Sequence, residues 1–195
     1  DKLSITDGRG FTTQYVFDAK GLVTEVLGPE GHSKQYRYDA LGRLCFEMDA
    51  EGHAIAYTYD ASNHLLSKIK DPKGAKNTTS YQYDGIGRTL TLTNPNSVQK
   101  VFTYDDQGFL ITSCLDPQGL NLISQFSYDD RGLLIRQTEL NPQCKNKVTE
   151  YVWDALGRRT AVIKDPAGLK LTTSYKYDAN DNTVAIIDAN GNATH

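Results

Sequence analysis

Short segments of alternating polar and apolar residues, separated by turn residues, run through the whole chain. Before one such turn, Tyr36 and Tyr38 stand at alternate positions, which puts both rings on one face of a strand. Residues 44–48 then alternate large apolar side chains with smaller or charged ones. Apolar residues at helical spacing are not sustained, and Gly or Pro interrupts the chain too often for helices with caps. The pattern predicts an all-β chain of antiparallel hairpins.

One turn signature recurs eight times: aromatic, any residue, aromatic, Asp, two residues, Gly. Asp at the first turn position and Gly at the fourth suit a type I turn followed by a left-handed residue, which closes a bulged hairpin. Asn63 and Asp181 replace Gly in two copies, and both side chain types tolerate left-handed geometry. The predicted structural repeat motif comprises Tyr15, Phe17, Asp18, Gly21, Tyr36, Tyr38, Asp39, Gly42, Tyr57, Tyr59, Asp60, Asn63, Tyr81, Tyr83, Asp84, Gly87, Phe102, Tyr104, Asp105, Gly108, Phe126, Tyr128, Asp129, Gly132, Tyr151, Trp153, Asp154, Gly157, Tyr175, Tyr177, Asp178 and Asp181.

A second turn signature alternates with the first. Its best form is Asp-Pro-x-Gly, and its copies are residues 7–10, 28–31, 49–52, 71–74, 94–97, 116–119, 141–144, 165–168 and 188–191. The same type I turn with Gly at the fourth position is predicted here. Ser97 and Cys144 occupy that position less well, so we expect those two turns to be looser or of another type.

Tandem repetition predicts that residues 1–195 form a single array of about eight hairpin repeats. An isolated hairpin is marginally stable, so neighbouring hairpins must stack their aromatic positions along a sheet. A wide open sheet has to twist or curl, and we expect a curved, spiralling one. Neither end departs from the repeat pattern, so we expect the array to be excised from a much larger chain, with strand edges open to edge-to-edge self-association. A β-propeller would double the repeat period, and it remains a less favoured alternative.

Composition excludes several functional classes. The net charge is −3 with both signs interspersed, which provides no electrostatic footprint for nucleic acid. No apolar run is long enough to span a bilayer. Cys45, Cys114 and Cys144 are too scattered for a disulfide framework or a zinc site.

The repeated aspartates do not favour an enzyme. An active site rarely needs the same carboxylate in every copy, so we assign these residues to turn capping and expect no catalytic residues, cofactor or metal. The segment Asp178–Asn182 begins like a calcium loop but lacks the required Gly and Glu. The four histidines, His32, His53, His64 and His195, are interpreted as solvated turn residues.

The stretch Tyr-x-Tyr-Asp-x-x-Gly-Arg-Leu at residues 36–44 resembles the YD repeat of the Rhs (rearrangement hot spot) family, and Gly-Arg recurs at 87–88 and 157–158. That family includes Rhs polymorphic toxins, shell subunits of Tc toxin complexes, wall-associated bacterial proteins and teneurins. The resemblance implies a spiralling β-sheet that closes into a hollow shell, which encloses a toxic domain in the toxins. The proteolytic role of Asp-Pro segments in Rhs toxins is not carried over to Asp71, Asp116 or Asp165, because these recur at turn spacing.

We therefore expect a structural, non-enzymatic shell segment of a large secreted or cell-surface protein delivered by a bacterial secretion system. Its expected partners are neighbouring repeats of the same protein and an enclosed toxin or effector domain. The alternative is an extracellular adhesion or recognition module that binds glycan or protein through its tyrosine-rich sheet.

Overall fold

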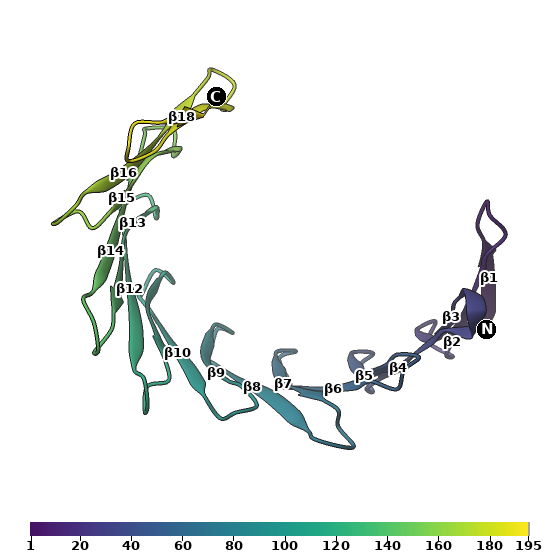
Figure 1. Ribbon diagram of the computed structural model, residues 1–195. Helices are drawn as coiled ribbons and strands as arrows, with labels where there is room; N and C mark the ends of the chain where they lie inside the picture. The colour runs from purple at the N-terminus through teal and green to yellow at the C-terminus, as the bar shows by residue number, and fades with distance from the viewer. Residues whose placement is uncertain (195) are drawn as a thin grey trace. The chain divides into compact units, whose positions relative to one another are not determined.

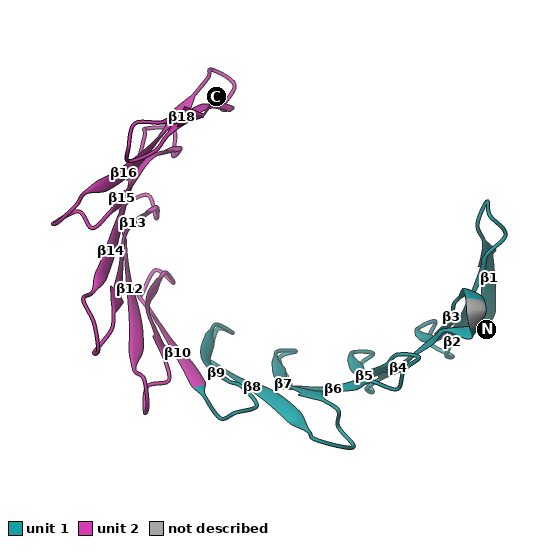
Figure 2. Cartoon of the chain, viewed as in Figure 1, with its two compact units in different colours: residues 1–98 teal, residues 99–195 magenta. Residues whose placement is uncertain are grey.

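The computed structural model describes residues 1–194 and the side chains of all of these except Glu30. The chain forms two compact units, residues 1–98 and residues 99–195 (Figure 2). In unit 1 each strand pairs antiparallel with the next, so that the strands follow one another in chain order (Figure 1). The elements of unit 1 are β1 (Lys2–Thr6), β2 (Thr12–Phe17), β3 (Val23–Leu27), the 3₁₀ helix η1 (Pro29–Gly31), β4 (Ser33–Tyr38), β5 (Leu44–Met48), β6 (Ala54–Tyr59), β7 (Leu65–Lys70), β8 (Asn77–Tyr83) and β9 (Thr89–Thr93).

Unit 2 is built in the same way, with every strand antiparallel to the one that precedes it within the unit. Its strands are β10 (Gln99–Tyr104), β11 (Leu110–Leu115), β12 (Leu122–Tyr128), β13 (Leu134–Leu140), β14 (Lys147–Trp153), β15 (Arg159–Lys164), β16 (Leu171–Tyr177), β17 (Thr183–Ile187) and β18 (Ala193–Thr194). The predicted fold class, an all-β open sheet of tandem antiparallel hairpins, is confirmed.

The turns of the first signature form as predicted. The fourth turn residue has a positive φ in all eight copies, from 66° at Asp181 to 94° at Gly108. In the copy at Asp39, the N–H of Gly42 donates to the Asp39 carbonyl at 3.0 Å and the N–H of Asp39 donates to the Arg43 carbonyl at 2.9 Å. The register shifts between Arg37 and Tyr38. The hairpin is therefore a type I turn with a bulge.

The turns of the second signature are less uniform than predicted. Ser97 adopts φ 63° and its N–H donates to the Asn94 carbonyl, so the expectation of an irregular turn there is wrong. The expectation is confirmed at Cys144, whose N–H also donates to the first turn residue but whose φ is not positive.

The prediction is wrong for the three Asp-Pro-x-Gly turns. Positive φ falls on Asp71, Asp116 and Asp165, and again five residues later on Lys76, Asn121 and Lys170, whereas the three glycines keep negative φ. The right-handed helical region is disfavoured for the residue before Pro, and Asp is among the few residues that tolerate the left-handed one. The Asp carbonyl also accepts the N–H of the residue five positions on, at 2.9 Å for Lys76. The result is a wider loop.

Glycine in this wider loop makes room for a carboxylate. A Cβ at Gly74 would lie 2.2 Å from Oδ2 of Asp71, whose Oδ1 accepts the N–H of Gly74 at 3.0 Å. Gly119 and Gly168 are in the same position relative to Asp116 and Asp165. Each of these loops falls in a repeat step of 24 residues rather than 21, a correlation that the sequence already contained.

Each unit is a single layer of strands without a covering layer. Among side chains that the structure describes, only Ala185 (6% exposed) and Ser113 (7%) are buried. The accessible surface is 13018 Å², against roughly 9,200 Å² for a compact monomer of this mass. No helix within residues 1–194 is long and apolar enough to cross a membrane. Stability therefore depends on contacts along the sheet, between one hairpin and the next.

Candidate functional site

The most regular site in the chain is the joint between successive hairpins, which begins at the turn aspartate. Oδ1 of Asp39 accepts the backbone N–H groups of Leu41 (3.0 Å) and Arg43 (2.9 Å). The backbone N–H of Arg43, together with its guanidinium, lowers the pKa of Asp39 from its ordinary value. The same two N–H groups bind the carboxylates of Asp18, Asp84, Asp105, Asp129, Asp154 and Asp178, and Asp60 accepts the N–H of His64.

In most copies the second aromatic residue of the motif ties its hairpin to the preceding one. The hydroxyl of Tyr38 donates to the carbonyl of Val23, the first residue of β3, at 2.9 Å. The backbone ladder between β3 and β4 ends at the pair Glu25–Gln35. The Tyr38 hydroxyl therefore binds a Val23 carbonyl that the β3–β4 ladder does not reach. The same bond joins Tyr59 to Leu44, Tyr83 to Leu65, Tyr128 to Leu110 and Tyr177 to Arg159, at 2.7–3.0 Å.

Tryptophan takes the place of tyrosine once in this position. The indole Nε1–H of Trp153 donates to the Leu134 carbonyl at 2.8 Å, as the tyrosine hydroxyls do elsewhere. The second position thus favours an aromatic ring with a polar donor at its tip, with Phe17 as the exception. The first position accepts phenylalanine twice, at Phe102 and Phe126.

First-position tyrosines bond to side chains of the preceding strand where these offer an acceptor. The Tyr57 hydroxyl donates to Oε1 of Glu47 at 2.6 Å, and the Tyr151 hydroxyl lies 3.4 Å from Oε1 of Gln137. Burial, followed by the hydrogen bond to Glu47, raises the pKa of Tyr57 to about 12. The neutral phenol is therefore the form that the fold binds.

The residue after the left-handed position completes the joint by packing on the second aromatic ring of the next repeat. The guanidinium carbon of Arg43 lies 4.8 Å from the Tyr59 ring centroid, and that of Arg158 lies 5.0 Å from the Tyr177 ring. His64 stacks on Tyr83 with centroids 4.9 Å apart. Phe109 stacks on Tyr128 at the same distance.

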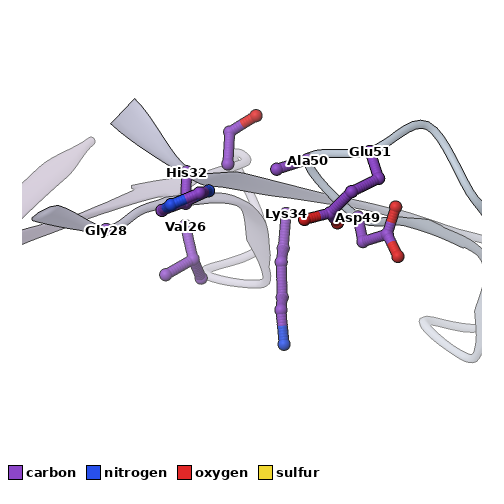
Figure 3. Close-up of a pocket in the computed structure, with 8 residues that line it drawn as sticks. Val26, Gly28, His32, Lys34, Asp49, Ala50 and Glu51 are labelled. Atoms are coloured by element: carbon purple, nitrogen blue, oxygen red, sulfur yellow. The ribbon is translucent and has the colours of Figure 1, made fainter. Parts of the chain in front are cut away.

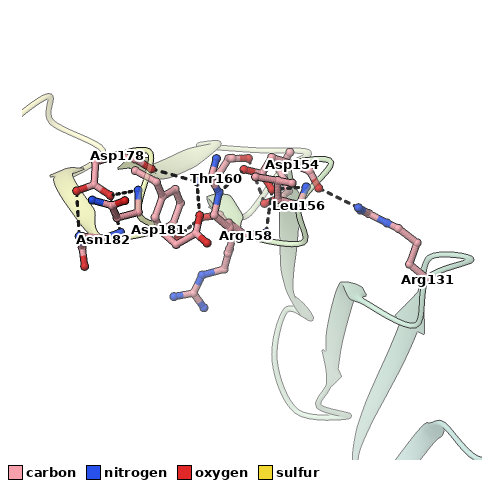
Figure 4. A network of polar contacts seen from close by, with 12 residues as sticks. Arg131, Asp154, Leu156, Arg158, Thr160, Asp178, Asp181 and Asn182 are labelled. Carbon is pink, nitrogen blue, oxygen red and sulfur yellow. Dashed lines mark hydrogen bonds and ion pairs between the residues drawn. The ribbon is translucent and has the colours of Figure 1, made fainter.

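The arginines in this position also bind polar groups on both sides of the joint. In the network of Figure 4, Nε of Arg158 donates to Oδ2 of Asp154 at 2.7 Å, and its NH1 donates to Oδ1 of Asp181 at 2.6 Å. Arg43 does the same between Asp39 (2.7 Å) and the carbonyl of Asp60 (2.8 Å). Each of these arginines thus joins two consecutive turns.

Sequence reasoning missed this role for Arg43, His64 and Arg158. A signal was present: both copies that replace Gly by Asn or Asp, at Asn63 and Asp181, follow a copy with Arg after its Gly. The NH1 of each arginine points to that side chain, at 3.5 Å from Asn63 Oδ1 and 2.6 Å from Asp181 Oδ1.

The interpretation of the histidines needs one correction. His64 is not a solvated turn residue, because its Nδ1 lies 2.9 Å from Oδ2 of Asp60 and its ring is stacked. His53 is exposed, as predicted. His32 lines the shallow hollow described next, and His195 lies outside the described residues.

One group of side chains has the composition of a metal site. Ligand atoms of Asp49, Glu51 and His53 lie within 4.8 Å of one another. The Asp49 carboxylate is already bound, by the His53 N–H at 2.8 Å and the His53 ring at 3.0 Å, so turn capping accounts for it. The carboxylate of Asp178 is likewise bound by the backbone N–H groups of Asn180 and Asn182.

Asp49 and Glu51 also line a shallow hollow of about 290 Å³ between two second-type turns, with His32 and Lys34 (Figure 3).

Comparison with known proteins identifies the repeat. The profile of the family described as Teneurin YD-shell matches residues 2–173. No curated protein matches the chain.

Solved structures align with the chain at low sequence identity. A chain of the crystal structure of TcdB2-TccC3-TEV aligns with a TM-score of 0.63 and 17% identity over 95% of this chain. The Photorhabdus luminescens Tc holotoxin pore aligns over 93% of this chain with a TM-score of 0.47 and 14% identity. This chain spans only 12% and 13% of the lengths of those chains. The first likeness concerns the fold alone.

Proposed function

Since the chain belongs to the teneurin YD-shell family, in which it is a structural segment of the shell, we propose that its segment of the wall encloses a toxin or effector domain. The observation that supports this function is the uniform joint. Asp-capped turns, tyrosine–carbonyl bonds and stacked side chains recur from hairpin to hairpin. A wall requires such repetition, whereas a catalyst requires one copy that differs.

We further propose that residues 1–195 act as one array within a longer, secreted or delivered bacterial protein. The two turn signatures alternate through residues 94–105 as they do elsewhere. One cooperative unfolding transition of the full chain, followed by circular dichroism, is the expected result. Two separate transitions would contradict a single array.

The enclosing function is tested in the full-length parent protein by protease protection of its other domains. The double variant Arg43→Leu with Arg158→Leu removes two arginines that each join two consecutive turns. Leucine already occupies this position in two other copies, as Leu22 and Leu133. We expect the double variant to expose an otherwise protected domain to cleavage. The matched control, Arg9→Leu with Arg37→Leu, removes the same charge from exposed positions and should leave protection unchanged. If both double variants protect as well as the parent, the wall does not depend on these joints.

The proposed absence of catalysis is tested by single exchanges of the turn aspartates. Asp39→Asn, Asp84→Asn and Asp154→Asn should have the same effect on every property of the protein, since the three carboxylates make the same bonds. A chemical activity abolished by only one of the three would refute a purely structural role.

A further inference from the structure

Two consecutive arginines in unit 2 lie on two tyrosine rings of the next hairpin but differ in their partners. The guanidinium carbon of Arg158 lies 5.0 Å from the centroid of the Tyr177 ring, and that of Arg159 lies 4.8 Å from the centroid of the Tyr175 ring. Carboxylates of Asp154 and Asp181 neutralise Arg158. The side chain of Arg159 makes no ion pair or hydrogen bond with any residue in the described part of the chain. Arg159 is therefore an unneutralised cation on the aromatic face.

The position of Arg159 is otherwise occupied by uncharged residues. The first residue of the outgoing strand is aliphatic or Thr in the other copies, namely Val23, Leu44, Leu65, Thr89, Leu110, Leu134 and Thr183. An arginine here carries a cost, because its Nε is enclosed and has no hydrogen-bond partner. Among the described residues, Nε of Arg159 is the only side-chain nitrogen or oxygen that is both buried and without a hydrogen-bond partner. The two terminal nitrogens of Arg159 also make no hydrogen bond, so they must be accessible to solvent.

Aromatic residues on the two neighbouring strands flank this cation. Trp153 lies directly opposite Arg159 in the β14–β15 ladder, so both side chains are on one face. The Trp153 ring is held by its bond to Leu134, and the backbone of Arg159 is held by the Tyr177 hydroxyl. Trp153, Tyr151 and Tyr175 are only half-buried. The site is thus preformed, and its aromatic side chains remain partly exposed to solvent.

We propose that Arg159, with Trp153 and Tyr175, binds the carboxylate of an acidic sugar. A guanidinium with two free terminal nitrogens matches a carboxylate in a bidentate geometry. Rings on either side of it offer flat apolar surfaces to the C–H faces of sugar rings, which an acidic peptide would not use in the same way. The site does not depend on the enclosing role proposed above, since it belongs to the surface of one hairpin pair.

Intrinsic fluorescence provides a direct test, because Trp153 is the only tryptophan in the chain. The full chain is titrated at low ionic strength with tetragalacturonate, its fully methyl-esterified form and tetraglutamate. We expect tetragalacturonate to change the fluorescence saturably. We expect the neutral ester and the acidic peptide to bind at least about tenfold more weakly, since each lacks one half of the recognition.

Variants separate the site from general charge. Arg159→Leu restores the side chain found in four other copies and should lower the affinity for tetragalacturonate about tenfold or more. Arg159→Lys should give an intermediate loss because it keeps the charge without the planar fork. The control Arg37→Leu removes a guanidinium that also lies on a ring, that of Phe46, at 5.0 Å in unit 1, and should change the affinity less than twofold.

Three results would overturn the proposal: no fluorescence response to tetragalacturonate at millimolar concentration, equal affinity in Arg159→Leu and the parent chain, or tetraglutamate binding as tightly as the sugar. The last result would assign Arg159 to an acidic protein partner instead. Circular dichroism of each variant confirms that a loss of binding is not a loss of fold. If Arg159→Leu does not fold, the comparison between Arg159→Lys and the parent still decides.

Discussion

In each unit the turns lie along two edges of the sheet, at opposite ends of the strands: the first-type turns form the first edge and the second-type turns form the second edge. The turns at the two edges differ in how uniform they are. At one edge, all eight first-type turns share one geometry, with a positive φ at the fourth residue and a register shift beside the second aromatic. At the other edge the turns include the 3₁₀ turn η1, three wide Asp-Pro loops and the irregular turn at Cys144. Four turns there, at residues 7–10, 49–52, 94–97 and 188–191, share the positive φ and the turn hydrogen bonds of the first type, but the ladders beside residues 7–10, 49–52 and 188–191 have no register shift.

The difference shows where the array is held together. The bonds of Tyr38, Tyr59 and Trp153 to the preceding hairpin lie at the first edge, beside the turn. A change of turn there would move the aromatic ring away from its carbonyl. At the second edge no such aromatic bond is found among the described residues, and the side-chain contact between successive turns is the exposed ion pair of Lys145 with Asp165 at 3.3 Å, so that a longer loop is accommodated. Sequence freedom at the second edge thus reflects the absence of these joints.

The largest expected effect comes from exchanging turns between the edges. Replacing residues 39–43 by the wide loop sequence of residues 71–76 should cost about 3 kcal/mol or more of unfolding free energy, because it displaces a turn that carries a joint. The same replacement at residues 49–53 should cost less than about 1 kcal/mol. Urea unfolding of both chimeras measures the two costs. Equal costs would mean that the edges do not differ.

Acid should have the next largest effect, and it should weaken turns at both edges, because the pKa of Asp49, Asp165 and Asp188 in second-type turns is also lowered. The pKa of Asp39, Asp129 and Asp154 is lowered in the fold, first of all by hydrogen bonds from the backbone N–H four residues on. A carboxylate with a lowered pKa stabilises the fold above its unfolded pKa, about 3.9, and that contribution is lost as the pH falls through the lower folded value. Stability should therefore be level between pH 7 and pH 5 and fall below about pH 4. Asp39→Asn should flatten this fall, and an unchanged profile in that variant would contradict the assignment.

A smaller effect separates the two aromatic positions. Tyr59→Phe removes the bond to the Leu44 carbonyl and should cost about 0.5–1.5 kcal/mol. Tyr36→Phe in the first position should cost less, because the Tyr36 hydroxyl makes no hydrogen bond with any described residue. Chemical denaturation of the two variants gives the difference. A greater loss in Tyr36→Phe would reverse the roles that the structure gives to the two rings.

The smallest expected effect is a coupling across one joint. Arg158→Leu and Asp181→Gly each restore residues found in other copies, and each breaks the contact of 2.6 Å between these side chains. The double variant should lose less stability than the sum of the single variants, because the two residues share one interaction. Strict additivity in the double-mutant cycle would show that the contact contributes nothing.

Hairpins, turn positions and strand ends could be predicted because each depends on residues close in the sequence. Asn63 and Asp181 marked left-handed positions as reliably as glycine. The Asp-Pro loops were predicted wrongly because Pro changes the conformation available to the preceding Asp, and Gly74 serves the carboxylate of Asp71 rather than a positive φ. Ser97 adopted the left-handed position in spite of its Cβ, since Asn94 supplies the same bonds as Asp.

The joints were not predicted, because they join residues about a full repeat apart and the one signal for them appears only when two successive copies are compared. Arg158 and Arg159 lie on rings of the same next hairpin, although neighbours in a regular strand face opposite ways; Arg158 precedes β15, and the register of the β14–β15 ladder shifts just after Arg159. The role of His64 was missed for this reason, since only the stacked ring of Tyr83 distinguishes it from a solvated histidine. Side-chain pairs of this kind become visible when two copies are compared in order.

The pairing of Arg43 with Asn63, and of Arg158 with Asp181, limits how such arrays can be rearranged. A hairpin ending in Asn or Asp suits a predecessor that offers a cation, so a module moved elsewhere by recombination would meet an unsuitable neighbour. Hairpins should be shuffled, duplicated or grafted in adjacent pairs. A designer who lengthens this protein would copy two at a time.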